Sequence, residues 1–199
     1  MGPARPGNGW TAHPPVPEGP PMHVIQLLEN DHREVDELFR RVHLSEKPET
    51  IDELTKQIVH DLSVHAAVEE QFVYPLLRAK VDGGSAMADE AIEEHQQAKR
   101  LLADLEKLDA GSADHAKAME SLIETIRHHV EEEESDVFPE LRDAVDASTL
   151  DRMGDLVEQA KKVVPTHPHP LVPGTATAQL VAGPWAATVD KVRDLLGGR

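Results

Sequence analysis

Two stretches of this sequence, HAAVEEQFVYPLLR at residues 65–78 and HVEEEESDVFPELR at residues 129–142, are near copies of one another. They align at an offset of 64 residues with seven of fourteen positions identical, where about one identity is expected from ordinary composition. Each copy contains His-x-x-x-Glu, and Pro follows six residues after that Glu. A weaker repeat, at an offset of 63 residues, aligns Asp31-His32 with Glu94-His95. The repeat predicts a body built from one helical hairpin used twice.

Around the repeat, apolar residues recur every three or four positions, which is the spacing of a buried helix face. Breaks that offer Gly, Pro or an N-capping Ser or Asp separate these segments. The pattern predicts helices at about 22–44, 49–81, 86–108, 113–146 and 149–163. Pro75 and Pro139 fall inside two of them, so a kink or a terminating turn is expected at each.

Four long helices joined by short breaks predict an all-α, up-down-up-down four-helix bundle, because short connections make consecutive helices antiparallel neighbours. The fifth, shorter helix adds to this bundle. We expect a Pro/Gly-rich arm at 1–21, the helical body at 22–164, and a Pro-rich extension at 165–199. Within that extension, the apolar spacing predicts a short terminal helix at about 185–196.

The amino-acid composition limits the partners and the kinds of site that the protein can have. The sequence has 20 Lys and Arg against 37 Asp and Glu, a net charge of −17 that repels nucleic acid and anionic membranes. It has no Cys, which excludes disulfides, thiolate zinc sites, iron–sulfur clusters and Cys nucleophiles. It shows neither a long apolar run nor a signal-peptide pattern, so we expect a cytoplasmic protein. No protein partner is predicted.

Polar residues interrupt the apolar face of each long helix near its middle. The first helix has His32, the second His65 and Glu69, the third His95, and the fourth His129 and Glu133. Positions four apart on a helix lie about 40° from one another, so each His-x-x-x-Glu presents an imidazole beside a carboxylate. Four imidazoles and two carboxylates would thus converge on the bundle axis. Such nitrogen and oxygen donors suit iron or manganese, and six of them, with carboxylates able to bridge, fit two ions better than one.

A structural interpretation competes with this one. A single His on an apolar stripe is more often a hydrogen-bonded core residue than a ligand. A Glu on a buried face is harder to dismiss, because an unpaired buried carboxylate is costly. The rest of the acidic run at 131–134 is interpreted as a solvated face. Four other histidines have no equivalent in the repeat and are interpreted as surface residues: His43, His60, His115 and His128.

The order His, His-x-x-x-Glu, His, His-x-x-x-Glu, with Pro after each Glu, resembles the hemerythrin-type HHE cation-binding family over about residues 22–146. The resemblance implies a four-helix bundle with a non-haem di-iron centre, bridged by an oxo or hydroxo species, at which O₂, peroxide, nitric oxide or azide binds. By position, the implied metal ligands are His32, His65, Glu69, His95, His129 and Glu133. Glu69 and Glu133 are the implied bridges, and manganese or zinc could substitute for iron.

One position departs from the oxygen-carrying members of that family, which have a further histidine four residues after the third-helix ligand. Lys99 stands there in this chain, and a protonated lysine cannot bind iron. One ion would then keep an open or water-filled position, which favours peroxide or nitric oxide chemistry, or simple iron binding, over reversible O₂ carriage. Tyr74 could replace the histidine only if the helix kinks at Pro75, because nine residues from His65 place it about 180° around a straight helix.

Three functions follow from these alternatives. The first is a di-iron protein of oxidative or nitrosative stress response or sensing, with a catalase-like peroxide-decomposing or nitric oxide-reducing activity left open. The second is a ferritin-like iron store, for which Glu29-x-x-His32 alone in the body has the required Glu-x-x-His spacing. The third is an acidic interaction module whose histidines are structural and whose fold needs no metal.

Overall fold

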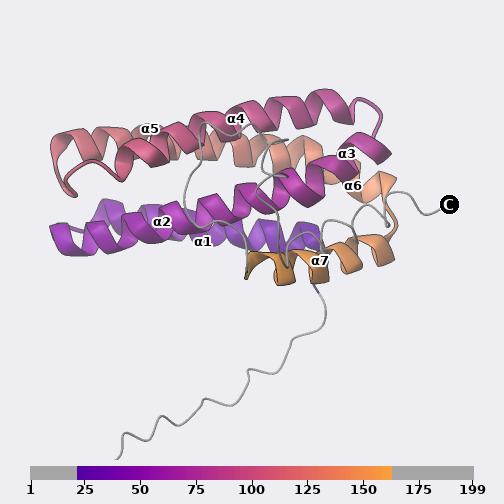
Figure 1. The fold of residues 1–199 in the computed structure, drawn as a ribbon, viewed down its shortest axis with the longest axis horizontal. Helices are drawn as coiled ribbons and strands as arrows, with labels where there is room; N and C mark the ends of the chain where they lie inside the picture. The colour runs from indigo at the N-terminus through magenta and orange to yellow at the C-terminus, as the bar shows by residue number, and fades with distance from the viewer. Residues whose placement is uncertain (1–21, 163–199) are drawn as a thin grey trace, which may run out of the picture.

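The structure is a computed structural model that describes residues 22–162, and this part of the chain is helical apart from short turns (Figure 1). Its elements are α1 (Val24–Leu44), α2 (Pro48–Val68), η1 (Glu69–Val73), α3 (Tyr74–Lys80), α4 (Gly84–Leu105), α5 (Ala113–Glu132), η2 (Glu133–Val137), α6 (Phe138–Ala144) and α7 (Ala147–Lys161). The predicted arm, extension and terminal helix at 185–196 lie outside the described residues.

Four rods run along the long axis of the molecule in Figure 1. They are α1, then α2 with η1 and α3, then α4, then α5 with η2 and α6. Rod α1 packs on α2, α4 packs on α5, and the fifth helix α7 packs on α1 and α2. The predicted all-α bundle is confirmed, and the predicted helix bounds agree with the observed ones to within three residues.

The core consists of two apolar clusters with a polar layer between them. Along α1, Leu28 belongs to the first cluster and Val35 to the second, and the buried His32 lies between them. The first cluster contains Phe72, Phe138 and the buried face of α7, and the second fills the other half of the bundle. The apolar clusters therefore hold four polar helix segments in register at the middle of the bundle.

Both long composite rods contain a π turn where a kink or terminating turn was expected. The Tyr74 N–H donates to the Glu69 carbonyl, and the Phe138 N–H donates to the Glu133 carbonyl, so each bond spans five residues. A proline in a regular helix collides with the carbonyl four residues earlier, and the wider π turn relieves this contact. The rods therefore continue through Pro75 and Pro139 instead of ending there.

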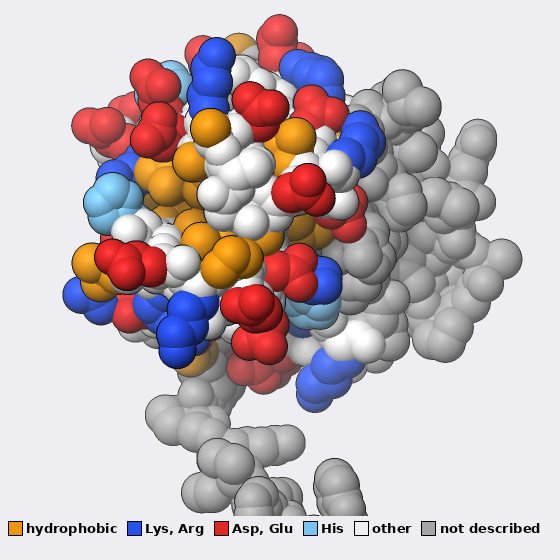
Figure 2. All heavy atoms as spheres, turned by 90° about the vertical axis from the view of Figure 1, so that its left-hand side faces the viewer, with side chains coloured by type: hydrophobic (Ala, Val, Ile, Leu, Met, Phe, Trp, Pro, Cys, Tyr) orange, Lys and Arg blue, Asp and Glu red, His pale blue; other side chains and the backbone are white. Residues whose placement is uncertain are grey.

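One end of the bundle carries the connections 45–47 and 106–112 and faces the viewer in Figure 2. Hydrophobic side chains gather at its middle, surrounded by acidic and basic ones. Near this end His115 is buried, and its Nε2 lies 3.1 Å from the Thr55 hydroxyl. The interpretation of His115 as a surface residue is therefore wrong, because its side chain is buried and Thr55 of α2 provides a buried polar partner. Between residues 22 and 162, no helix combines the length and apolarity that crossing a membrane requires.

Candidate metal centre

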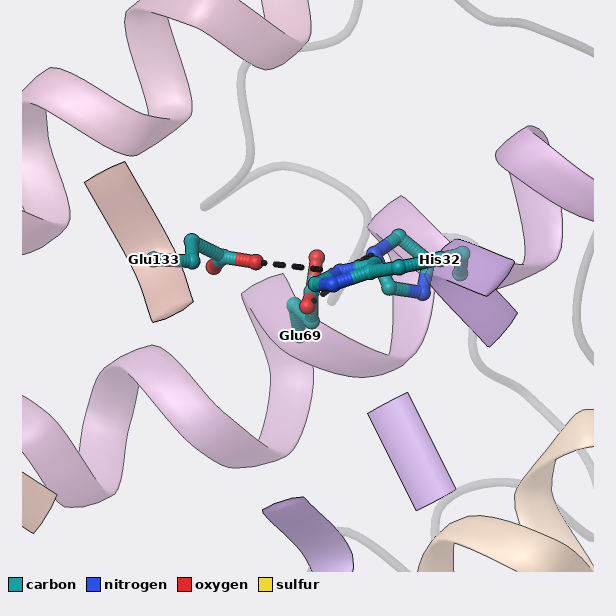
Figure 3. A group of neighbouring side chains, drawn as sticks. His32, Glu69 and Glu133 are labelled. Carbon is teal, nitrogen blue, oxygen red and sulfur yellow. Dashed lines mark hydrogen bonds and ion pairs between the residues drawn. The ribbon is translucent and has the colours of Figure 1, made fainter. Parts of the chain in front are cut away.

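All six side chains predicted as ligands meet in the polar layer, and all are buried. Their donor atoms form two overlapping groups, each with its members within 4.8 Å of one another. The first group is His32, His65, Glu69 and Glu133, and the second is Glu69, His95 and His129. Figure 3 shows Glu133 and His32 approaching from opposite sides, with Glu69 between them. The layer is thus one cluster with two halves that share a carboxylate.

Glu69 spans the two halves of the layer. Its Oε1 lies 3.1 Å from His65 Nε2, and its Oε2 lies 3.3 Å from His95 Nε2. The π turn η1 begins at this residue, and none of its side chain is exposed to solvent. One oxygen facing each half is the arrangement that a bridging carboxylate needs.

Glu133 also contacts both halves. Its Oε2 lies 3.4 Å from His32 Nε2 and 3.5 Å from His129 Nε2. Within the halves, His32 and His65 approach at 3.2 Å between their Nε2 atoms, and His95 and His129 at 3.1 Å. All four imidazoles therefore direct Nε2 inward, toward each other and toward the two carboxylates.

The outward nitrogen of each imidazole has its own acidic partner. The Nδ1 contacts are His32 with Glu134 at 2.9 Å, His65 with Asp31 at 3.2 Å, His95 with Glu70 at 3.1 Å, and His129 with Glu94 at 2.8 Å. A carboxylate that accepts from Nδ1 fixes the tautomer that leaves the Nε2 lone pair free, and it makes that nitrogen more basic. The second layer thus prepares all four rings to bind a cation.

These acidic partners were not predicted, although the repeat contained the signal. Glu70 follows Glu69 just as Glu134 follows Glu133, and the acidic residue before His32 is repeated before His95. The sequence interpretation placed Glu134 in a solvated face. Its side chain is 43% exposed, yet it accepts from a buried imidazole. A half-exposed residue at the edge of a helix face can therefore serve a buried site.

The pKa values of several side chains in the layer are shifted by the opposite charges of their neighbours. Burial alone would lower the pKa of His65, but Glu69 and Asp31 outweigh it and raise that pKa to about 10. Glu69 and Glu70 likewise raise the pKa of His95 to about 9 against the effect of burial. Burial would raise the pKa of Glu69, and the neighbouring imidazoles instead hold it well below its usual range. The carboxylates of this layer thus favour positive charge at its centre.

Three buried carboxylate oxygens have no hydrogen-bond partner: both oxygens of Glu69, and Oε2 of Glu133. A buried carboxylate oxygen without a donor is costly, and a cation satisfies it directly. The inward donors are imidazole nitrogens and carboxylate oxygens, a set that suits iron or manganese. The residues present therefore fit a two-ion centre.

Tyr74 joins this layer, which the sequence allowed only with a kinked helix. Its hydroxyl donates to Glu133 Oε1 at 2.9 Å and lies 3.2 Å from His95 Nε2. The π turn holds one extra residue, so about 100° of helical rotation is lost and Tyr74 lies roughly 80° rather than 180° around from His65. Burial, with the charges of Glu133 and Glu69, raises the pKa of Tyr74. The phenol adds an oxygen donor on the His95 side.

Lys99 occupies the outer layer. Its ammonium lies 2.6 Å from Glu70 Oε1, and both side chains are buried. Although burial opposes it, His95 and Lys99 together hold the pKa of Glu70 below its usual range. Lys99 therefore acts on the carboxylate that orients His95, and it takes the space that a further histidine ligand would need.

A small cavity of about 20 Å³ adjoins the four imidazoles on the side of the second apolar cluster. Its remaining walls include the charged residues Asp31 and Lys99 and are otherwise aliphatic: Val35, Leu62, Ala66, Ala98, Leu102, Ile126 and Val130. A cavity of this size holds about one water-sized molecule. The space beside the layer thus fits a ligand of one or two heavy atoms.

Comparison with known proteins agrees with this arrangement. Residues 23–141 match the family model described as the hemerythrin HHE cation binding domain. The chain is 30% identical over 174 residues to an uncharacterized hemerythrin-like protein of Schizosaccharomyces pombe, covering 87% of this chain and 86% of that one. It is 27% identical over 143 residues to a protein named DNA nickase from a Nostoc species, covering 72% of this chain and 40% of that protein. A crystal structure of a hemerythrin HHE cation binding domain-containing protein from Mycobacterium kansasii matches the fold with a TM-score of 0.61 at 20% identity, covering 85% of this chain and 98% of that one.

Proposed function

Because this chain belongs to the hemerythrin HHE cation-binding family, we propose that its polar layer holds two iron ions and binds O₂, peroxide or nitric oxide there. The observation that carries the proposal is Glu69, which directs one oxygen to each half of the layer and has no hydrogen bond at either. If the histidines were structural, protonated His65 and His95 would balance the charge of Glu69 across contacts of 3.1 and 3.3 Å, whereas two cations would satisfy both oxygens directly.

The residues divide between the two ions by half. His32 and His65 would hold one ion and His95 and His129 the other, while Glu69 would be shared. Glu133 contacts both halves as the second shared carboxylate. Tyr74 provides a further oxygen donor on the His95 side. This division gives the two ions unequal ligand sets.

When bound, the iron pair supplies two redox-active Lewis-acid centres that can exchange electrons with a small ligand. The protein supplies the surroundings. Asp31, Glu70, Glu94 and Glu134 orient the imidazoles through their Nδ1 atoms. The adjoining cavity, with mostly aliphatic walls, admits only a very small molecule. A ligand set and pocket of this kind support a role in oxidative or nitrosative stress, as sensor or as peroxide-removing enzyme.

The nickase activity in the name of the Nostoc relative is not part of this proposal. The match covers 40% of that protein. The net charge of −17 also opposes binding to a phosphate backbone.

Metal analysis by mass spectrometry tests the proposal, with Glu69→Ala/Glu133→Ala beside the wild type. We expect about two iron ions per wild-type chain and a near-complete loss in the double variant. A matched control, Glu131→Ala/Glu140→Ala, removes the same charge from exposed positions and should keep its iron. Equal iron content in wild type and Glu69→Ala/Glu133→Ala, or no iron uptake by folded wild type, would refute the di-iron centre.

A second measurement identifies the ligand chemistry. The near-ultraviolet absorbance of the iron-loaded protein should change on adding azide, peroxide or nitric oxide, because each occupies a position beside the ions. Turnover of excess peroxide would assign an enzyme, and a spectral change without turnover would assign a sensor. A spectrum that none of the three ligands changes would contradict binding at this centre.

A further inference from the structure

An open pocket of about 240 Å³ lies between α4 and the α5–η2 rod, beside the polar layer. Its lining is strongly acidic: Glu90, Glu94, Glu132, Glu133 and Asp136 contribute five carboxylates, with Met87, Ala91 and Val137 as the apolar remainder. Among these acids, Glu90 and Asp136 are exposed, Glu94 and Glu132 are half-buried, and Glu133 is buried. The acidic residues therefore form a graded path from the surface to the layer.

Beside the outer part of this pocket, two of its carboxylates converge with the exposed His128, which does not itself line the pocket. His128 Nε2 lies 3.3 Å from Glu132 Oε1 and 3.6 Å from Glu94 Oε1. The three donor atoms all lie within 4.8 Å of one another. One imidazole with two carboxylates is a donor set suited to a divalent transition metal.

Two connections lead from the pocket to the polar layer. The Glu94 carboxylate offers Oε1 to the outer donors, while its Oε2 accepts from His129 Nδ1 at 2.8 Å. Glu133 lines the pocket, is 1% exposed, and carries a buried Oε2 without a hydrogen bond. A cation that enters the pocket thus meets an unsatisfied buried carboxylate at its inner end, which is an observation independent of the outer acidic cluster.

The equivalent place in the other half of the repeat has an ammonium group beside its three carboxylates, which belong to Asp31, Glu34 and Asp61. There Asp31 is the counterpart of Glu94, and it accepts from Lys161 of α7 at 2.6 and 2.5 Å. Lys161 also lines the small cavity of about 80 Å³ on that side. The ammonium offsets part of the negative charge there, whereas the pocket beside α4 has five carboxylates and no Lys or Arg in its lining, so it is the favoured approach for a cation.

We propose that this pocket is the metal-uptake site of the protein: Glu94, His128 and Glu132 bind a divalent cation, Fe²⁺, at its mouth, and Glu133 receives the ion into the polar layer. The inference rests on the proposed function, because it supplies the ions of that centre. Carboxylates gathered in a concave site concentrate cations and accelerate their association. Half-exposed donors bind weakly enough to release the ion inward.

The test compares Glu132→Gln/His128→Gln with a matched control, Glu124→Gln/His43→Gln, in which the same substitutions fall on exposed residues away from the pocket. Metal-free full-length protein is mixed with Fe²⁺ without oxygen, and the unbound ion is followed with a ferrous chelator. We expect about tenfold slower uptake in Glu132→Gln/His128→Gln, with unchanged final iron content, and wild-type uptake in the control.

A second readout separates this inference from the proposed function. Iron-loaded protein is titrated with Mn²⁺ alone, and free Mn²⁺ is followed by electron paramagnetic resonance. One weakly held Mn²⁺ per wild-type chain, lost in Glu132→Gln/His128→Gln, supports the uptake site. Unchanged uptake kinetics together with an unchanged Mn²⁺ titration would overturn it. If wild type takes up no iron, the proposed function fails, and the Mn²⁺ titration of the metal-free chain then decides the outer site alone.

Discussion

Tyr74 and its repeat counterpart Phe138 make the two halves of the polar layer chemically unequal. Tyr74 lies beside His95 with its hydroxyl at 3.2 Å, whereas the Phe138 ring stacks on His32 at 5.8 Å between ring centres and offers no donor. The His95 half therefore has one more oxygen than the His32 half. In the proposed two-ion centre, the ion beside His32 and His65 would have one protein oxygen donor fewer than the other ion.

The substitution Tyr74→Phe tests this inequality, since it keeps the ring and removes only the hydroxyl. We expect the iron content to stay near wild type and the visible phenolate-to-Fe³⁺ absorption band to disappear. In the metal-free protein, Glu133 Oε1 loses its donor, so the free energy of unfolding should fall by about 1–3 kcal/mol. Absorbance and urea unfolding measure the two effects. A visible spectrum identical to that of wild type would show that Tyr74 is not a ligand.

At the level of helices, the sequence predicted well which segments form helices and where each helix begins and ends, because apolar spacing and breaks at Gly and Pro are local signals. It also identified the six side chains that converge, because each interrupts an apolar face. The sequence did not predict which way the side chains after Glu69 and Glu133 face. That prediction assumed a constant rotation of about 100° per residue, which does not hold through a π turn. Tyr74 was misplaced for this reason. Contacts such as Glu134 to His32 depend on the packing of helices far apart in sequence, which spacing along one helix does not report.

The π turns predict an unusual response to deletion. Ser135 is exposed within η2, and removing it should convert the π turn into regular α-helix. Pro139 would then collide with the carbonyl four residues before it, so the free energy of unfolding should fall by about 3 kcal/mol. Adding Pro139→Ala to the deletion should restore most of that loss, as urea unfolding would measure.

Pro139→Ala alone is the control for this deletion, and it should have little effect, because the π turn already avoids the collision. If the deletion destabilises the Pro139→Ala variant as much as it destabilises the wild type, the proline does not explain the π turn.

For the whole molecule, the duplicated hairpin explains why the centre is nearly symmetric, and the additions to it explain where the symmetry ends. The α7 helix packs on α1 and α2, and its Lys161 neutralises Asp31 on that side. The side formed by α4 and α5 keeps its acidic residues open in the pocket that Glu94 and Glu132 line. One half of the repeat thus has an ammonium group among its outer carboxylates, whereas the pocket of the other half has no Lys or Arg in its lining.

The placement of the polar layer between two apolar clusters predicts that metal removal weakens the entire bundle. All four rods contribute side chains to this layer, so the layer joins the two clusters and its loss of counter-charge affects both. An ion present at a thousand times its dissociation constant adds about 4 kcal/mol of stability, which corresponds to roughly 10 °C in Tm for a chain of this size. Circular dichroism should therefore show a Tm about 10 °C lower after reduction and chelation of the iron.

The control for this prediction is Glu69→Ala/Glu133→Ala, which lacks the shared carboxylates, and its Tm should not respond to the chelator. An equal Tm for wild type with and without chelator would favour the acidic interaction module, in which the buried histidines are structural and the carboxylates of Glu69 and Glu133 are balanced by protonated imidazoles alone.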